Sequence, residues 1–162
     1  MPLTFLRNLG IVSAAGITTT KLGAGAVLQA VTATDSTQRS TTSSSFVTAS
    51  NTLSVSITPS SASNKVFITV TGNLYIDIAG GYALATIYRN STNLGSADGM
   101  ACVYSSSTSL PIGSMSMSVL DSPNTTSSIT YQVYVRKNAN PSTVYMQEPA
   151  GKSSITCFEI AG

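Results

Sequence analysis

The chain has 162 residues, of which 42% are hydrophobic and only 9% are charged, against roughly 25% charged residues in ordinary globular proteins. This composition excludes a disordered chain, because disorder combines low hydrophobicity with high net charge. The net charge is +2 and the basic residues are scattered, which excludes a phosphate-binding surface for nucleic acid. No apolar run approaches the roughly 20 residues of a spanning helix, so we expect no membrane insertion.

Residues 1–28 are predicted to form an arm or linker that docks onto other proteins. Residues 16–26 are rich in Gly and Ala, and the preceding stretch carries the expected apolar anchors of the arm, Leu3, Phe5, Leu6, Leu9 and Ile11. A secretory signal is the alternative interpretation of this stretch. Its apolar segment, Leu9–Val12, is shorter than the roughly 7–15 residues that such a signal needs, which favours the arm.

Residues 29–162 are predicted to form one β-sandwich domain. Strand-like segments separated by Gly, Pro and Asn turns begin at the end of the arm and follow in chain order: 27–34, 46–49, 52–58, 65–71, 74–78, 82–89, 100–104, 114–121, 129–136, 143–147 and 153–160. Short strands at such intervals are typical of a sandwich or barrel. We therefore predict an all-β, antiparallel β-sandwich of jelly-roll type. Gly72 is expected to form a bulge, or a bend where a strand passes between sheets.

Several of these segments alternate a hydroxyl side chain with an apolar one, as in residues 52–58 and 114–119. A two-residue period places the apolar groups on one face of a strand and the hydroxyls on the other. Ser and Thr make up about 30% of the chain and replace the usual charged residues. A surface with so few charges protects poorly against self-association. We expect much of it to be covered by partners, above all by copies of the same chain.

The residues that carry most enzyme chemistry are sparse. The chain has no histidine, which removes the usual general base, the Ser-His-Asp triad and the commonest metal ligand. Its acidic residues are Asp35, Asp77, Asp98, Asp121, Glu148 and Glu159. A pair for glycoside hydrolysis can be drawn from them, but predicted turns at Asp98-Gly99 and Asp121-Ser122-Pro123 and a polar loop at Asp35 explain most of their positions. We expect no enzymatic activity, no catalytic residues, no cofactor and no metal.

The two cysteines, Cys102 and Cys157, could form one disulfide or remain free thiols. Cys157 lies in an apolar run, where a free cysteine packs as a small hydrophobe. A fold built on disulfides would normally contain more cysteines, which favours free thiols.

Tyr82, Tyr104 and Tyr145 lie near predicted loops or strand ends and are candidate surface contacts for a host surface glycan or protein. The alternative is that these rings pack in the core or between subunits.

Four segments together resemble the fibre-like virion proteins of tailed bacteriophages of aquatic bacteria. Gly16–Gln29 resembles the linker before a fibre tip domain, and Ser56–Val66 resembles a recurrent strand-turn-strand of that domain. Leu120–Thr126 and the ending Ser153–Gly162 also fit this pattern. The resemblance covers the chain from about Gly16 onward.

The resemblance implies a homotrimeric, non-enzymatic virion component at the particle surface, assembled in the host cytoplasm. A short tail fibre for host attachment is the expected role. The arm would then bind other virion proteins. Only 28 residues precede the β domain here, whereas a long fibre has an extended shaft. This departure supports an alternative role, a capsid decoration protein whose arm clamps the shell.

Overall fold

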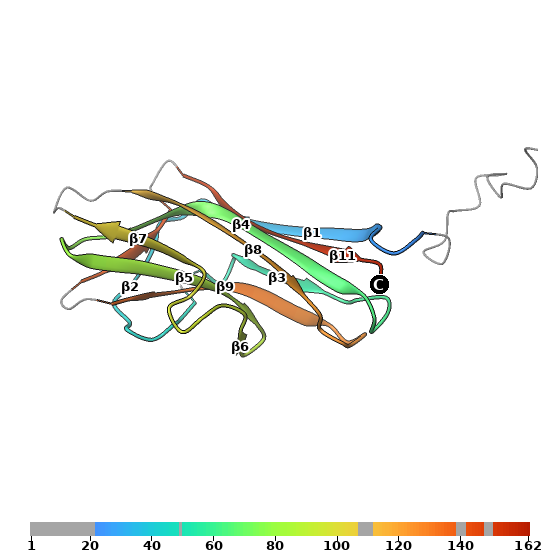
Figure 1. The fold of residues 1–162 in the computed structure, drawn as a ribbon. Helices are drawn as coiled ribbons and strands as arrows, with labels where there is room; N and C mark the ends of the chain where they lie inside the picture. Colours follow the sequence, from blue (N-terminus) through green and yellow to red (C-terminus); the bar gives the residue numbers. More distant parts are fainter. Residues whose placement is uncertain (1–21, 49, 107–111, 139–141, 148–150) are drawn as a thin grey trace, which may run out of the picture.

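The computed structural model describes residues 22–48, 50–106, 112–138, 142–147 and 151–162, and the regular elements of these residues are all strands (Figure 1). They are β1 (Val27–Asp35), β2 (Arg39–Thr41), β3 (Ser54–Ile57), β4 (Lys65–Ile76), β5 (Gly81–Arg89), β6 (Thr92–Asn93), β7 (Ala101–Ser105), β8 (Gly113–Asp121), β9 (Ile129–Lys137), β10 (Val144–Met146) and β11 (Ser153–Ile160). Within these ranges, no helix has the length and hydropathy to cross a bilayer. The prediction of an all-β domain is confirmed.

The strands form two antiparallel sheets that pack as a sandwich. Sheet A has the order β1-β11-β4-β10-β2, with β8 on the other edge of β4. Sheet B has the order β3-β9-β5-β6, with β7 also paired to β5. Eight of the strands pair in nested order, β1 with β11, β3 with β9, β4 with β8 and β5 with β7, and these pairs alternate between the sheets. One long hairpin rolled over two sheets gives this order, so the predicted jelly roll is confirmed.

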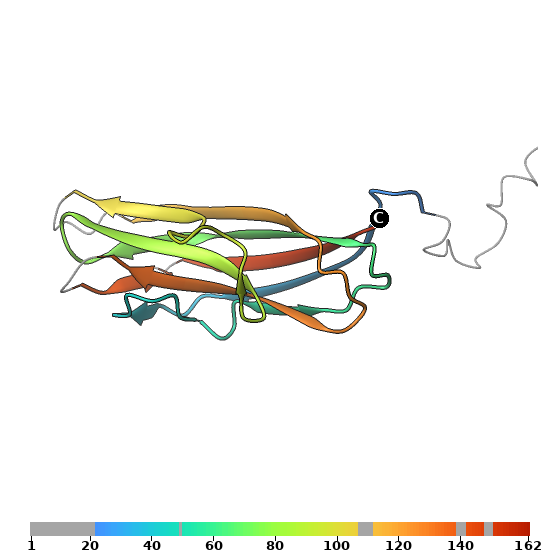
Figure 2. The ribbon, with the colours of Figure 1, turned by 60° about the horizontal axis from the view of Figure 1, so that its bottom comes forward.

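The sandwich has two different ends. At the terminal end, β1 begins and β11 finishes, and the backbone N–H groups of Gly25 and Ala161 donate to the carbonyls of Ala161 and Ala26 at 2.8 and 2.9 Å. At the opposite, loop end, β4 finishes and β5 begins (Figure 1; Figure 2). Strand β1 starts at Val27, so the last two residues of the predicted arm belong to the sandwich. The arm anchors, Leu3, Phe5, Leu6, Leu9 and Ile11, lie outside the described residues.

The core lies between the sheets and is built from alternate residues of the strands. The strict alternation of buried and half-buried residues along β9 and β11 shows the two-residue period directly. Burying each large aliphatic side chain contributes about 1.5–3 kcal/mol. The fully buried members include Leu53, Val66, Ile68, Leu74, Ile76, Ile87, Tyr131, Val133, Val135, Val144, Met146, Ile155 and Cys157.

Gly72 does not play the role predicted for it. Strand β4 runs without a break through Gly72 and pairs with β8 from Val66 to Leu74 with no register shift, so there is no bulge and no change of sheet. On the other edge of β4, its partner changes from β11 to β10 around this glycine. A Cβ at position 72 would lie 2.2 Å from Ser153 Oγ. Glycine is therefore needed for close packing against β11.

The segment predicted as a strand at 46–49 is not one, and Ala49 lies outside the described residues. Val47 makes only an isolated bridge with Val135, beside the second half of β9. The Phe46 ring instead packs edge-on against Tyr88 and beneath the guanidinium of Arg136. Two short strands, β2 and β6, were not predicted because they contain no apolar residue to mark a buried face.

Candidate interaction surfaces

The outer face of sheet A carries side chains in rows that cross β1, β11, β4 and β8. We call Ala30, Phe158, Phe67 and Leu120 the apolar row, because they are successive cross-strand partners. Two hydroxyl rows run beside it: Thr32, Thr156, Thr69 and Ser118, then Thr34, Ser154, Thr71 and Ser116. The sequence alternation thus becomes a surface on which apolar and hydroxyl groups lie in separate bands.

The apolar row is open to solvent near the terminal end. Phe67 is 36% exposed and Leu120 is 53% exposed, and the ring of Phe67 stacks on that of Phe158 with 6.4 Å between centroids. In the hydroxyl rows, Thr32 bonds to Thr156 and Thr71 bonds to Ser154, each pair at 2.9 Å between Oγ atoms. Such bonds hold the side chains in a fixed surface pattern.

Charge is nearly absent from this face. Of the outward-facing residues on β1, β4, β8 and β11, only Lys65 is charged, and it lies at the terminal end. Elsewhere the three described arginines form ion pairs with Asp35, Asp121 and Asp98. A neutral face with an exposed apolar band lacks the charges that normally oppose association.

Sheet B has a depression on its outer face, towards the loop end. Its volume is about 370 Å³, and its lining residues are Tyr82, Leu84, Asp98, Gly99, Met100, Ala101, Cys102 and Asn138. Tyr82 and Tyr104, which face each other across β5 and β7, place their rings 4.8 Å apart at a tilt of 41°. The two residues are 38% and 50% exposed.

One wall of the depression is a firmly held turn after β6. Asn93 Oδ1 accepts hydrogen bonds from Thr86 Oγ1 and Gly95 N–H, and Ser96 and Gly99 exchange backbone hydrogen bonds. Gly99 has a φ of +88°, and a Cβ there would lie 2.5 Å from the carbonyl oxygen of Ala85. The turn predicted at Asp98-Gly99 is therefore confirmed, and glycine is required in it.

The sequence-predicted tyrosines do not form one site. Tyr82 and Tyr104 meet beside the depression on sheet B. Tyr145 is half-buried on β10 of sheet A, where its ring stacks on Tyr75 at 4.7 Å and 6°. The two cysteines are free, Cys102 exposed on β7 and Cys157 buried on β11, as the composition favoured.

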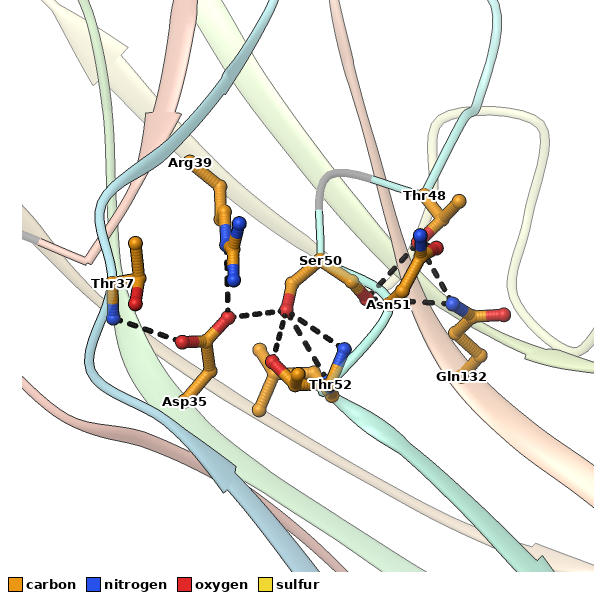
Figure 3. Close-up of polar contacts among 9 residues, drawn as sticks. Asp35, Thr37, Arg39, Thr48, Ser50, Asn51, Thr52 and Gln132 are labelled. Carbon is orange, nitrogen blue, oxygen red and sulfur yellow. Dashed lines mark hydrogen bonds and ion pairs between the residues drawn. The ribbon is translucent and has the colours of Figure 1, made fainter.

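Asp35 is a structural anchor rather than a loop residue. It ends β1, is buried, and accepts hydrogen bonds from Ser50 Oγ, from Thr37 N–H at 2.8 Å and from Arg39 Nε at 3.1 Å (Figure 3). Burial acts to raise the pKa of Asp35, but these hydrogen bonds outweigh it and hold the pKa well below its usual range. The network continues through Ser50 into the segment that leads to β3 (Figure 3).

Glu159 anchors the terminal end from inside. It is 1% exposed and accepts hydrogen bonds from Gln29 Nε2, Ser60 N–H and Asn64 Nδ2 at 2.6 Å each, and from Ser60 Oγ at 2.8 Å. Burial acts to raise its pKa, and these neutral donors more than offset it, so the pKa is lowered. One carboxylate thus ties together β1, β11 and the turn between β3 and β4.

Asp121 joins the two sheets. Both of its carboxylate oxygens accept from Nη1 of Arg89 at 2.9 Å, and Oδ2 also accepts from the hydroxyl of Tyr131 at 2.6 Å. Burial, followed by the hydrogen bond to Asp121, raises the pKa of the Tyr131 hydroxyl. Since Asp121 lies on β8 and its partners on β5 and β9, the cluster bridges sheet A and sheet B.

The acidic residues that the structure describes therefore have structural partners. Asp77 accepts the backbone N–H of Thr143 at 2.7 Å, and Asp98 pairs with Nη2 of Arg136 at 2.7 Å. Glu148 lies outside the described residues. Among those that are described, no three His, Cys, Asp or Glu side chains gather in a way that could hold a metal ion.

Acid is expected to destabilise the fold through Asp35 and Glu159. Both carboxyls have a lowered pKa in the folded chain, so their contribution is complete above the unfolded pKa of about 4 and is lost as the pH falls through the folded value. Thermal unfolding followed by circular dichroism should show a midpoint that falls steadily below about pH 4. The double variant Asp35→Asn, Glu159→Gln should be less stable at neutral pH and should lose less stability in acid. An unchanged slope in acid would contradict this assignment.

Comparison with known proteins gives likenesses to solved structures only. No family model matches the chain, and no curated protein matches it. A solved structure of infectious bursal disease virus, Gt strain, is similar over 83% of this chain and 38% of the matched chain, at 14% sequence identity and a TM-score of 0.44. The structure of a mutant VP2 protein of that virus, from derived T=1 particles, is similar over 93% of this chain and 41% of the VP2 chain, at 14% sequence identity and a TM-score of 0.46. The chain thus spans about two fifths of the length of these structures, and at such TM-scores the likeness assigns no function.

Proposed function

We propose that this chain is a non-enzymatic structural protein at the surface of a bacteriophage particle, with host attachment through a short tail fibre as its role. The observation that carries the proposal is that the apolar row and the depression lie towards opposite ends of the sandwich. The exposed apolar row of sheet A lies near the terminal end, where the chain enters β1. The tyrosine-lined depression of sheet B lies towards the loop end.

This arrangement suits a protein that is held at one end and makes contacts at the other. The neutral outer face of sheet A would pack against copies of the chain in a homotrimer, and the arm would bind other virion proteins. The resemblance of Gly16–Gln29 and of the later segments to fibre-like virion proteins supports the same role. The described carboxylates, being engaged in structural hydrogen bonds, favour a structural protein over a hydrolase.

Capsid decoration is the second candidate. It is favoured by the neutral outer face of sheet A with its exposed apolar row, which also suits packing against a shell. Quantitative mass spectrometry of purified particles separates the two roles by copy number per particle. We expect a few to tens of copies, together with antibody labelling at the tail. Hundreds of copies over the head would establish decoration, and absence from particles would overturn both roles.

A further inference from the structure

The depression on sheet B combines apolar and polar groups in a way that suits a sugar. Leu84, which is 5% exposed, and the neighbouring Met100 and Ala101 give it an apolar lining. The Tyr82 ring adds an aromatic surface, on which the apolar face of a pyranose ring can lie. Ligand sites of this kind are mostly apolar, with a few placed polar groups that fix orientation.

Two polar side chains in the lining are placed to make such contacts. Asn138 is fixed by two hydrogen bonds to Tyr82: its side-chain Oδ1 accepts from the backbone N–H of Tyr82 at 2.6 Å, and its backbone N–H donates to the Tyr82 carbonyl at 3.2 Å. Because Oδ1 is bonded to Tyr82, the side-chain nitrogen Nδ2 of Asn138 is the group that can donate a hydrogen bond to a ligand. The side chain of Asp98 is 85% exposed while it pairs with Arg136, so its carboxylate can accept sugar hydroxyls.

Charge selects the class of sugar. Among the described residues that line the depression there is one carboxylate and no basic side chain, and Arg136 beside it is already paired with Asp98. A carboxylated or sulfated sugar would meet a negative charge there without a cation to bind it. A neutral sugar avoids this penalty, and an acetamido group supplies a methyl for the apolar lining and a carbonyl for the amide of Asn138.

We propose that this depression binds a neutral N-acetylhexosamine residue of a surface glycan. The inference deepens the attachment role and rests on it for the biological source of the glycan, while the binding itself can be tested on the isolated protein. A single sugar of this size should bind weakly, with a Kd of the order of 1 mM.

Cys102 provides a built-in reporter, because it is a free, exposed thiol in the lining of the depression. The other thiol, Cys157, is fully buried, and burial raises its pKa to about 12. A thiol reagent should therefore modify Cys102 alone in the folded chain. Saturating N-acetylglucosamine or N-acetylgalactosamine should slow this modification at least fivefold, and glucose and galactose at the same concentration should not.

Variants locate the binding on the same residues. Tyr82→Ala should weaken binding at least tenfold in ligand-observed NMR titrations, and Tyr82→Phe, which keeps the ring, should retain it. Tyr145→Ala is the matched control, because Tyr145 also belongs to a tyrosine pair but lies on sheet A. Circular dichroism of each variant confirms that the fold is kept.

Each outcome is decisive. If none of the sugars protects Cys102 or binds in the NMR titration, the site is overturned. Equal protection by glucose overturns the assignment to N-acetylated sugars, and binding that survives Tyr82→Ala overturns the location. Sugar binding by a protein absent from particles would keep this inference and reject the virion role. A protein that is present on particles but does not bind these sugars would keep the virion role and reject this inference.

Discussion

Replacing Glu159 with alanine is expected to lower the free energy of unfolding by about 2–4 kcal/mol, because several neutral donors lose a charged acceptor and each unsatisfied buried donor costs about 1–3 kcal/mol. The change leaves the donors on Gln29, Ser60 and Asn64 without their acceptor at a site where Glu159 is 1% exposed. Buried donors without partners keep their full desolvation cost. Urea unfolding at neutral pH, followed by circular dichroism, measures the loss.

The control is Glu159→Gln, which keeps the shape of the side chain. Its single carbonyl oxygen can still accept from Ser60 and Asn64, and its amide nitrogen can donate to Gln29 once the Gln29 amide turns over. That rotation gives up the bond from Gln29 Nε2 to the Thr58 carbonyl at 2.9 Å, so we expect a loss of about 1 kcal/mol. Equal losses in the alanine and glutamine variants would show that the hydrogen bonds of the carboxylate are not what holds this end.

Gly72→Ala is expected to destabilise the chain by about 2–3 kcal/mol, although alanine normally suits a strand no worse than glycine does. The added Cβ would lie 2.2 Å from Ser153 Oγ and 2.9 Å from Ser153 Cβ, in the middle of sheet A. Neither side chain can move away freely, because Ser153 is fully buried and β4 is paired on both edges around position 72. Urea unfolding again gives the magnitude.

The double variant Gly72→Ala, Ser153→Gly tests the cause. Removing the serine side chain opens the space that the new methyl group needs, so the two changes together should cost much less than their separate effects added. Ser153 Oγ has no hydrogen-bond partner among the described residues, so the serine gives up no bond when it is removed. Additive losses would mean that the clash with Ser153 is not the reason for glycine at position 72.

Much of the fold could be predicted from the sequence, because the hydroxyl–apolar alternation fixes which residues of each strand face the core. Strand β11 has the predicted bounds, and β1, β5, β8 and β9 lie within one residue of theirs. Sequence alone could not decide the role of Gly72. A β-bulge and a close approach by a neighbouring strand both require glycine, so the residue type does not distinguish them. It also could not place Asp35, whose partner Ser50 lies 15 residues away in the chain.

The apolar row was missed, although its signal is present in the sequence. Phe67, Leu120 and Phe158 each occupy the same alternate positions as the Ser and Thr of their own strand. Each therefore breaks the hydroxyl pattern with a large apolar side chain on the outer face. The three breaks align only once the register of β4, β8 and β11 is known, and that register is set by long-range pairing. The depression on sheet B depends in the same way on the turn after β6, which folds back against β5.

The central claim is that the outer face of sheet A joins copies of this chain, and the mass of the full chain in solution tests it most directly. Multi-angle light scattering should give three times the 16.7 kDa of one chain. Leu120→Lys should reduce this mass to that of one chain, because it places a charge in the apolar row at a residue that is 53% exposed. Tyr104→Lys, at a residue 50% exposed on sheet B, should leave the mass unchanged. A wild-type chain that stays at 16.7 kDa, or an assembly that tolerates Leu120→Lys, would contradict the claim.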